Sequence, residues 1–291
     1  MNKKLLSQYG LKWNPFSPDL PTEALFSTPK IDSFIFRIEQ AHLREGGFAL
    51  ITGDPGMGKS VAMRLLAERL AKAPGVVVGA IAHPQCNVAD FYREMGEVFG
   101  VPLKPHNRWN GFKALRERWL AHIESTLERP VLLIDEVQEM TVPVLCEMRL
   151  LSSMRFDSRI LLSVILAGDG RFVEKLRRDD LMPLGSRIRA RLVLEPATSE
   201  DLLSCLKHLL SMAGNPSLMT KELMATLADH SMGNYRVLTV MASELLAAAA
   251  EREASQLDEK LFLEVFGGVR KASSSSIVAA AAAPARVGRR P

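Results

Sequence analysis

Eight consecutive residues constrain the fold of this chain more than any other feature of its sequence. They run from Gly53 to Ser60, read GDPGMGKS and fit the pattern GxxxxGK[ST]. The apolar segment Phe48–Thr52 precedes them, and a helical pattern of apolar residues follows from Ser60. A glycine-rich loop between a buried strand and a helix is the arrangement that wraps phosphate groups. The segment therefore predicts a strand, a phosphate-binding loop and a helix, in this order.

The residue types in this loop suit ATP with Mg²⁺. Glycines let backbone N–H groups approach the phosphates, and the helix N-terminus adds partial positive charge. We expect Lys59 to reach the β- and γ-phosphate oxygens and Ser60 to ligate Mg²⁺. The residues expected to bind the nucleotide here are Gly53, Asp54, Pro55, Gly56, Met57, Gly58, Lys59, Ser60 and Val61.

Two adjacent carboxylates follow another apolar segment. Val131–Ile134 leads into Asp135 and Glu136, which puts both side chains at the carboxyl edge of the predicted sheet, where such proteins bind ligands. Asp135 is expected to hold Mg²⁺ through its water shell, and Glu136 to orient and polarise the attacking water. An acidic pair at a strand end is often only a solvated turn, but the phosphate loop in the same chain favours the catalytic interpretation.

Strand-sized apolar segments alternate with helical patterns through the first two-thirds of the chain. Because these segments are apolar on both faces, they suit a parallel sheet with helices on each side. The expected strands are Phe48–Thr52, Val76–Ala82, Val131–Asp135, Ile160–Ala167 and Leu192–Leu194. The expected helices between them are Ser60–Ala73, Val88–Phe99, Gly111–Leu127, Val144–Phe156 and Phe172–Arg178. The sequence thus predicts a doubly wound α/β domain.

The chain is expected to have four parts. Residues 1–46 should pack on the nucleotide site, and residues 47–197 should form the α/β domain. Residues 198–268 carry only helical patterns and should form a small C-terminal helical lid domain. Residues 269–291 contain no acidic residue and are expected to be a disordered basic tail. This tail is either a solvated terminus or a basic arm that touches DNA or a partner protein.

Composition excludes several classes of protein. The chain has 291 residues, a net charge of +4 and 47% hydrophobic residues, which is ordinary for a globular protein. No apolar run approaches the roughly 18 residues that span a bilayer, and no secretory signal is visible at the start. The three cysteines lack the spacing of a disulfide framework or a thiolate metal site. We expect a cytoplasmic protein without membrane contact.

Three later residues are candidates for contacts with the γ-phosphate. Asp169 follows the fourth expected strand. It either forms a hydrogen bond with the attacking water or the γ-phosphate, or is only a turn residue. Arg187 stands among alternating arginines before the last strand. It is either the arginine that meets developing charge on a neighbouring subunit's nucleotide or part of a surface charge cluster. Arg236 opens a helix of the second domain and is expected to swing onto the bound phosphates.

These elements, in this order and followed by a helical domain, resemble the AAA+ ATPases over about Leu5–Phe266. Within that superfamily the chain is similar to the ExeA/GspA-like group and to transposition helper ATPases of the TniB, TnsC and MuB type. The segments that carry the resemblance are Tyr9–Leu11, Asn14–Ser17, the phosphate loop, Asp135–Met140, Glu147–Leu151, Ala167–Asp169 and Gly185–Ile188.

The resemblance implies roles for four residues. Phe16 would lie near the adenine, although a packed N-terminal anchor explains it equally well. Asp169, Arg187 and Arg236 would be sensor 1, the arginine finger and sensor 2. The group often has Gln at the position of Asp169, so the chain departs from the pattern there.

The resemblance also implies a function. The chain would hydrolyse ATP, form a homo-oligomeric ring or filament, bind double-stranded DNA without base specificity and recruit or regulate a transposase. An alternative is an ATPase for secretion or envelope assembly that acts on protein partners, and a third is a scaffold switched by nucleotide. Seven basic residues either track DNA phosphates or form a solvated helical face: Arg149, Arg155, Arg159, Arg171, Lys175, Arg177 and Arg178.

Overall fold

The computed structural model describes residues 3–81, 84–103 and 108–267. The chain divides into two compact units. The sheet unit comprises residues 21–196, and the helical unit combines residues 1–20 with the chain from Ala197 onward. The segment that we expect to be a basic tail, residues 269–291, lies outside the described residues.

The sheet unit is built on five parallel strands in the order β2-β3-β6-β1-β7. Their bounds are β1 Gly47–Gly53, β2 Val78–Ile81, β3 Val131–Ile134, β6 Ser163–Gly168 and β7 Ile188–Leu194. Thr52 of β1 lies beside Gly168 of β6, and Ile134 of β3 lies beside Leu166. The carboxyl ends of β1, β3 and β6 are therefore neighbours at one edge of the sheet.

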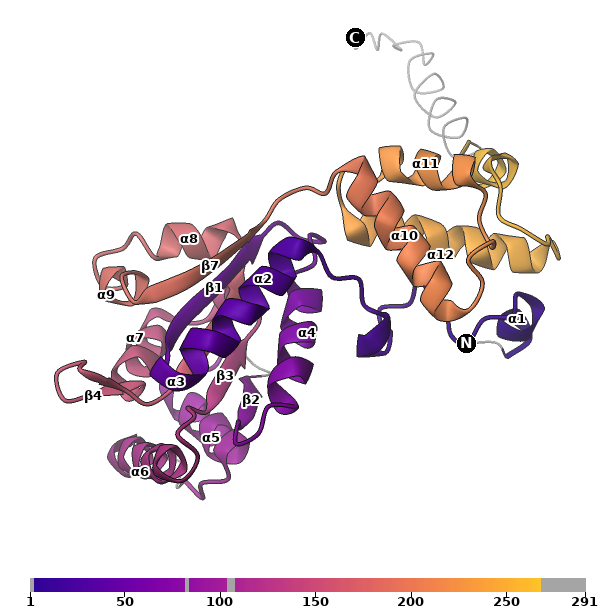
Figure 1. Ribbon diagram of the computed structural model, residues 1–291. Coiled ribbons are helices and arrows are strands. Elements are labelled where there is room, and N and C mark those ends of the chain that lie inside the picture. The colour runs from indigo at the N-terminus through magenta and orange to yellow at the C-terminus, as the bar shows by residue number, and fades with distance from the viewer. Residues whose placement is uncertain (1–2, 82–83, 104–107, 268–291) are drawn as a thin grey trace, which may run out of the picture. The chain divides into compact units, whose positions relative to one another are not determined.

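Helices cover both faces of this sheet (Figure 1). The helices of the sheet unit are α2 Pro29–Arg37, α3 Leu43–Glu45, α4 Lys59–Ala71, α5 Val88–Phe99, α6 Arg108–Thr126, α7 Val142–Leu151, α8 Gly170–Lys175 and α9 Met182–Gly185. A π-helical turn, Ile38–His42, joins α2 to α3, and short 3-10 turns lie at Thr22–Ala24 and Val137–Glu139.

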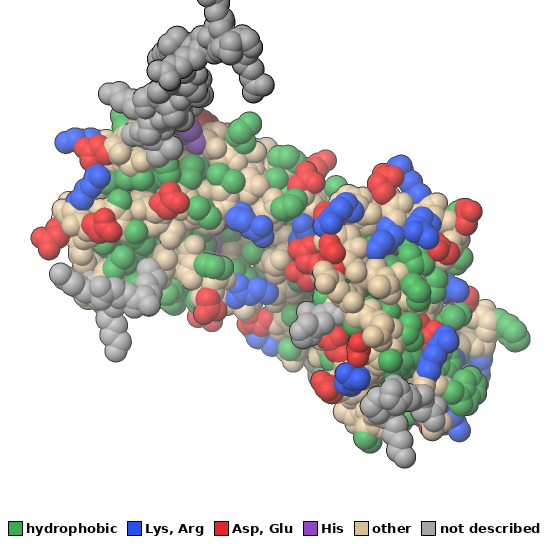
Figure 2. All heavy atoms as spheres, turned by 180° about the vertical axis from the view of Figure 1, so that it is seen from behind, with side chains coloured by type: hydrophobic (Ala, Val, Ile, Leu, Met, Phe, Trp, Pro, Cys, Tyr) green, Lys and Arg blue, Asp and Glu red, His purple; other side chains and the backbone are tan. Residues whose placement is uncertain are grey.

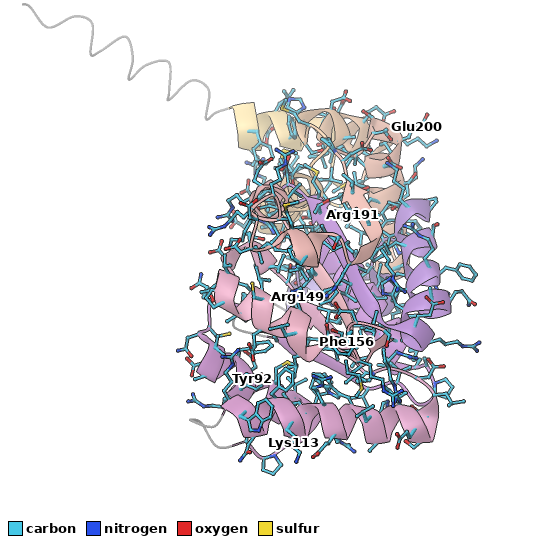
Figure 3. The ribbon with its side chains drawn as sticks, turned by 90° about the vertical axis from the view of Figure 1, so that its left-hand side faces the viewer. Tyr92, Lys113, Arg149, Phe156, Arg191 and Glu200 are labelled. Atoms are coloured by element: carbon cyan, nitrogen blue, oxygen red, sulfur yellow. The ribbon has the colours of Figure 1, made fainter. Side chains whose placement is uncertain are left out.

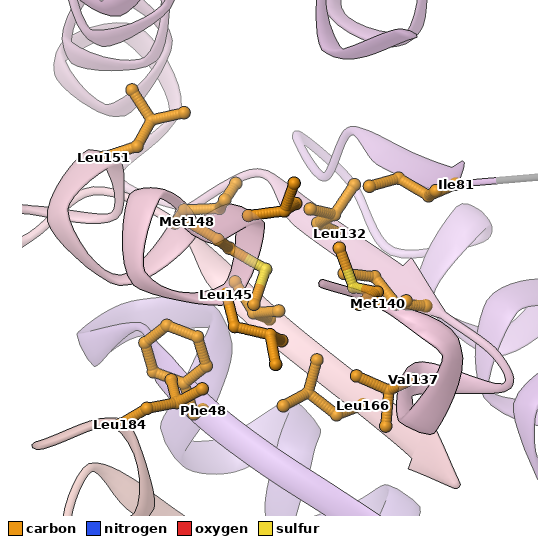
Figure 4. Packing of buried hydrophobic residues seen from close by; sticks show 14 of the residues in the cluster. Phe48, Ile81, Leu132, Val137, Met140, Leu145, Met148, Leu151, Leu166 and Leu184 are labelled. Carbon is orange, nitrogen blue, oxygen red and sulfur yellow. The ribbon is translucent and has the colours of Figure 1, made fainter. Parts of the chain in front are cut away.

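Alternate residues of the strands feed two separate apolar clusters. Phe48, Leu132 and Leu166 point to one face, where α5, α6 and α7 pack (Figure 4). Ile51 and Leu133 point to the other face, where α2 and α4 pack. Because both faces are covered, the central strands β1, β3 and β6 are buried and mostly apolar, as the sequence predicts.

The prediction of a parallel α/β sheet is confirmed, and the largest differences lie at β7 and at the end of α7. The last strand begins at Ile188 rather than Leu192. Alternate residues from Ile188 are buried while Arg189 and Arg191 are exposed, so the arginine segment itself is the edge strand.

The other difference follows α7, which ends at Leu151 rather than Phe156. A short antiparallel hairpin of β4 Ser153–Met154 and β5 Arg159–Ile160 replaces the last predicted helical turn. Arg155, Phe156 and Asp157 form its tip with φ values of 51°, 55° and 65°. The spacing of apolar residues does not predict this turn. Its left-handed residues are not glycine, so the usual marker of such a backbone is also missing.

The helical unit contains α1 Lys3–Gln8, α10 Ser199–Ala213, α11 Lys221–His230 and α12 Tyr235–Glu251. Thr198 and Asp201 form a capping box at the start of α10, which satisfies backbone N–H groups of its first turn. The apolar faces of α10, α11 and α12 share one buried cluster.

The N-terminal residues divide differently from the expected segment 1–46. Tyr9, Leu11 and Phe16 are buried in the cluster of the helical unit. Asn215 fixes this segment by donating a hydrogen bond to the backbone oxygen of Tyr9 at 2.8 Å. Only residues from Pro21 onward belong to the sheet unit.

Among the described residues, no helix is both long and apolar enough to cross a bilayer. Figure 2 shows lysine and arginine side chains interspersed with aspartate and glutamate on the visible faces of both units.

Candidate nucleotide site

The phosphate loop connects β1 to α4. At Gly53 an added Cβ would lie 2.7 Å from the backbone oxygen of Leu194, so the close approach of β7 requires glycine. Gly58 has φ 95° in the left-handed region and is the N-cap of α4, a helix of 13 residues. No side chain caps this helix start. Its first N–H groups, which lack intrahelical acceptors, therefore suit an anion.

Lys59 is buried at the first position of α4, with 6% of its surface exposed. Its Nζ donates to the backbone oxygens of Gly53 at 2.8 Å and Asp54 at 3.2 Å. Within the part of the chain that the structure describes, Lys59 forms no ion pair with a carboxylate. A buried ammonium is costly without an opposite charge. The phosphates of a nucleotide would supply this charge, so the loop fits ATP.

Ser60 and Asp135 come together across the edge of the sheet. The Oγ of Ser60 donates to Oδ2 of Asp135 at 3.0 Å, although the residues are 75 positions apart. A hydroxyl and a carboxylate are ligands that Mg²⁺ accepts beside phosphate oxygens and water. The described residues contain no cluster of three or more His, Cys, Asp or Glu side chains that could hold a metal. Mg²⁺ would therefore depend on the nucleotide for the rest of its ligands.

Glu136 has a left-handed backbone, with φ 51° and ψ 41°. Its N–H donates to Oδ1 of Asp135 at 2.9 Å. This conformation is unfavourable for a residue with a side chain and is found most often at functional sites. The turn places the carboxylate of Glu136 beside Asp135 rather than continuing β3.

Gln138 is a site residue that the sequence reasoning missed. It is 6% exposed, and its Nε2 donates to Oε2 of Glu136. Its Oε1 accepts from the backbone N–H of Asp169 at 3.3 Å. Lys175 donates from Nζ to the backbone oxygen of Gln138 at 2.7 Å, and burial lowers the pKa of Lys175. The spacing of Gln138 two residues after Glu136, in a turn, is the signal that could have found it.

Asp169 reaches this network through its backbone. Its carboxylate caps α8 by accepting from the N–H of Arg171 at 2.9 Å, and it pairs with the Arg171 guanidinium at 2.8 Å. Arg171 also pairs with Glu139 at 3.1 Å. A contact between the Asp169 carboxylate and the γ-phosphate would require these bonds to break, and it stays a prediction.

Arg187 lies at the amino end of β7, whereas the phosphate loop of the same chain lies at the carboxyl ends of the strands. It directly precedes β7, whose first residue Ile188 lies beside Phe48, while the last residue Leu194 lies beside Gly53. Seven residues of strand span about 20 Å. Arg187 therefore cannot reach the nucleotide of its own chain while β7 stays paired with β1.

The remaining candidates belong to the helical unit. Arg236 is exposed in the first turn of α12, where Asn234 caps the helix by accepting from the Arg236 N–H at 2.9 Å. Its contact with phosphates stays a prediction. Phe16 is only 4% exposed and packs in the apolar cluster of this unit. The ring thus packs as the expected N-terminal anchor would, and its contact with adenine stays a prediction.

The seven basic residues expected to track DNA do not form one uniform surface. Arg171, Lys175, Arg177 and Arg178 are engaged with carboxylates or backbone oxygens close by. Arg149, Arg155 and Arg159 remain around the β4–β5 hairpin.

Comparisons with known proteins agree with this fold. A family model described as an AAA domain matches residues 42–176, from the end of the π-helical turn before α3 through α8. The fold, the phosphate loop and the acidic strand end together define an α/β P-loop ATPase, and this part of the chain is similar to an AAA domain.

The chain is also similar to particular proteins. General secretion pathway protein A of Aeromonas hydrophila is 28% identical over 248 residues, which cover 84% of this chain and 44% of that protein. The chain thus spans less than half the length of this relative.

Among solved structures, the fold is similar to Cdc6p of Pyrobaculum aerophilum, with TM-score 0.66, 15% identity, and 84% of this chain and 67% of that chain covered. It is also similar to the ORC1 protein of Aeropyrum pernix in complex with DNA, with TM-score 0.62, 19% identity, and 91% and 71% covered. The RuvB motor of Thermotoga maritima matches with TM-score 0.54, 18% identity, and 86% and 72% covered.

Proposed function

We propose that the chain binds ATP with Mg²⁺ in one copy and completes the hydrolytic site with Arg187 from a second copy. The observation that carries this proposal is the position of Arg187 at the far edge of the sheet from its own phosphate loop. An arginine supplied by a neighbour stabilises charge that develops on the transferred phosphoryl group. Hydrolysis thus requires assembly of a homo-oligomer.

Each residue of the site has a separate task in this mechanism. The loop backbone and Lys59 bind the phosphates, and Ser60 and Asp135 hold Mg²⁺. Glu136 orients the attacking water and accepts its proton, while Gln138 holds the Glu136 carboxylate in place. Asp169 is proposed as sensor 1, and Arg236 of the helical unit as sensor 2.

Mixing two inactive variants tests the shared site. Arg187→Ala subunits keep a complete phosphate loop, and Glu136→Gln subunits keep a complete arginine. If the arginine acts between copies, a mixture hydrolyses ATP at an interface that pairs Glu136 of one subunit with Arg187 of the other. Neither variant alone should turn over ATP at a comparable rate. A mixture as inactive as its components would overturn the proposal.

For the partner we propose double-stranded DNA and, through it, a transposase that the ATP-bound oligomer recruits or regulates. The net charge of +4 and the arginines around the β4–β5 hairpin support contact with phosphates. ATP and DNA occur together in the cytoplasm, and the proposal places the protein there. Imaging of the protein with a non-hydrolysable ATP analogue, with and without duplex DNA, tests this step. DNA-dependent rings or filaments are expected, and assemblies that ignore DNA would contradict it.

A second candidate function is assembly of a secretion or envelope complex through protein partners. The observation that favours it is the 28% identity to general secretion pathway protein A over 84% of this chain. Retention on duplex DNA that needs ATP and falls steeply with salt separates the two candidates. Such retention supports the transposition function, and its absence favours the protein partners.

A further inference from the structure

A groove outside the nucleotide site lies between the first half of α6, the end of α7 and the β4–β5 hairpin. Its volume is about 690 Å³. Figure 3 shows Arg149 of α7 and Phe156 of the hairpin on the side of the sheet unit where α6 carries Lys113. None of the lining residues belongs to the phosphate loop or to the acidic end of β3.

Two aromatic rings and a guanidinium group stack on one another along this groove. The rings of Trp109 and Phe112 are nearly parallel, with an angle of 4° and centroids 6.2 Å apart. The Arg116 guanidinium lies 4.8 Å from the Phe112 centroid. Trp109 is 72% exposed, so the indole presents its surface to solvent. This exposure shows that Trp109 is not part of the apolar core.

The hairpin contributes another unpacked ring. Phe156 is fully exposed at the tip, between Arg155 and Asp157. All three residues have positive φ, a conformation that costs free energy in residues with side chains. Such backbone persists where the surroundings hold it, and it clusters at ligand-binding sites.

The groove has an excess of positive charge. Its two carboxylates are already neutralised, because Glu147 pairs with Arg108 and Asp157 pairs with Arg187. Glu147 also accepts from the Tyr92 hydroxyl at 2.5 Å.

Three arginines of the lining stay without such partners. Among the described residues, no ion pair involves Arg116, Arg149 or Arg155. The Nε of Arg149 is buried without a hydrogen-bond acceptor. The groove therefore has positive charge to offer a ligand with regularly spaced negative charges.

We propose that this groove binds single-stranded DNA. Aromatic faces for bases, beside arginines for phosphates, are the combination by which proteins hold single strands without sequence preference. Duplex DNA keeps its base faces stacked inside the helix and would leave Trp109 and Phe156 without a partner. An acidic peptide would use the arginines but not the parallel stack of rings. The proposal extends the DNA contacts of the proposed function, but it needs neither ATP nor an oligomer.

Binding of a fluorescein-labelled oligothymidylate of about 20 nucleotides to the full chain, followed by fluorescence anisotropy, tests this inference. Loss of one stacking ring weakens single-strand binding by about fivefold to a hundredfold, and we expect this from Trp109→Ala and from Phe156→Ala. Arg155→Glu should weaken binding and flatten its salt dependence. The matched controls are Phe36→Ala and Arg44→Glu, which change an exposed ring and an exposed charge outside the groove, and they should bind normally.

Two further arms make the result decisive. Lys59→Ala should keep its affinity for the oligonucleotide, so failure of the nucleotide site and failure of the groove are distinguishable. Oligothymidylate should outcompete a duplex of equal length, an oligouridylate and a polyglutamate peptide. The inference is overturned if oligothymidylate does not bind, if Trp109→Ala and Arg155→Glu bind it as well as the unaltered chain, or if any of the three competitors binds more tightly.

Discussion

Arg187 donates a hydrogen bond to Asp157, which lies 30 residues earlier at the tip of the β4–β5 hairpin. The Arg187 side chain is 23% exposed, and one of its terminal nitrogens is buried without a hydrogen-bond partner. The arginine that we assign to a neighbouring nucleotide is thus held by a carboxylate of its own chain. When two copies assemble, Arg187 has to leave Asp157 and contact phosphate oxygens of the neighbouring copy's nucleotide.

Asp157→Asn should make this exchange easier. Partly exposed ion pairs are worth about 0.2–1 kcal/mol, so removal of the charge should raise ATP turnover about 1.5- to fivefold at protein concentrations where assembly is incomplete. At saturating subunit concentration, the ATP hydrolysis rates of Asp157→Asn and of the unaltered chain should become equal. The measurement is the ATP hydrolysis rate as a function of subunit concentration. Asp180→Asn, which removes the partner of Arg178 elsewhere on the unit, is the control, and a curve that matches this control would refute the role of Asp157.

The contact between Ser60 and Asp135 predicts a Mg²⁺ dependence. Asp135→Asn keeps the shape of the side chain but removes the charge that a divalent cation prefers. We expect this variant to need much more Mg²⁺ for half-maximal hydrolysis, while it binds ATP without Mg²⁺ as the unaltered chain does. The check is a Mg²⁺ titration of the ATPase rate, together with binding of a fluorescent ATP analogue in the presence of a chelator. Equal Mg²⁺ requirements would remove Asp135 from the cation site.

Gln138 is expected to act through Glu136. Gln138→Leu removes the amide that holds the carboxylate and should lower kcat by about 10- to 100-fold, part of the 10²–10⁴-fold contribution of a general base. Because the hydrogen bonds of the Gln138 side chain join it to Glu136 and Asp169, affinity for ATP should stay unchanged.

The double variant Gln138→Leu/Glu136→Gln gives the sharper test. Residues that act as one unit lose activity non-additively, so the double variant should be no slower than Glu136→Gln alone. Gln85→Leu, which removes an exposed amide 3.5 Å from Glu139, is the matched control. Additive losses in the double variant would show that Gln138 acts elsewhere.

Much of the sheet unit follows from local sequence signals. Gly53 and Gly58 are required by a close approach and by a left-handed backbone, and a pattern that demands glycine at these positions specifies the loop between β1 and α4. Asp135 follows an apolar segment whose parallel pairing brings it beside the loop. Its meeting with Ser60 was therefore predictable.

Other features depend on tertiary contacts that sequence spacing does not encode. From its sequence, Phe16 is as consistent with adenine binding as with packing, and only the fold shows that it is buried in the cluster of the helical unit. Asp169 follows a strand as predicted, but the cap of α8 and the ion pair with Arg171 engage its carboxylate. The hairpin that holds Arg187 has three left-handed residues and no glycine, and Asp157 and Ser158 alone do not specify its geometry.

The burial of His42 predicts how the stability of the sheet unit depends on pH. It is 3% exposed and its Nδ1 has no hydrogen-bond partner. Burial, together with the positive charges of Arg189 and Arg37, lowers its pKa to about 4, although Glu45 acts in the opposite direction. The folded chain thus keeps His42 neutral at pH values where an unfolded chain protonates it, since the ordinary pKa is about 6.5.

The sign of the effect follows from proton binding. Between pH 6.5 and about 4 the unfolded state binds more protons at His42 than the folded state, so the free energy of unfolding falls as the pH falls through this window. At pH 5 the loss amounts to about 2 kcal/mol, or about 4–8 °C in Tm for a unit of this size. His42→Leu should lose less stability than the unaltered chain between pH 7 and pH 5. Thermal unfolding of both proteins at the two pH values checks this, and an equal fall in Tm would show that other groups cause the acid sensitivity.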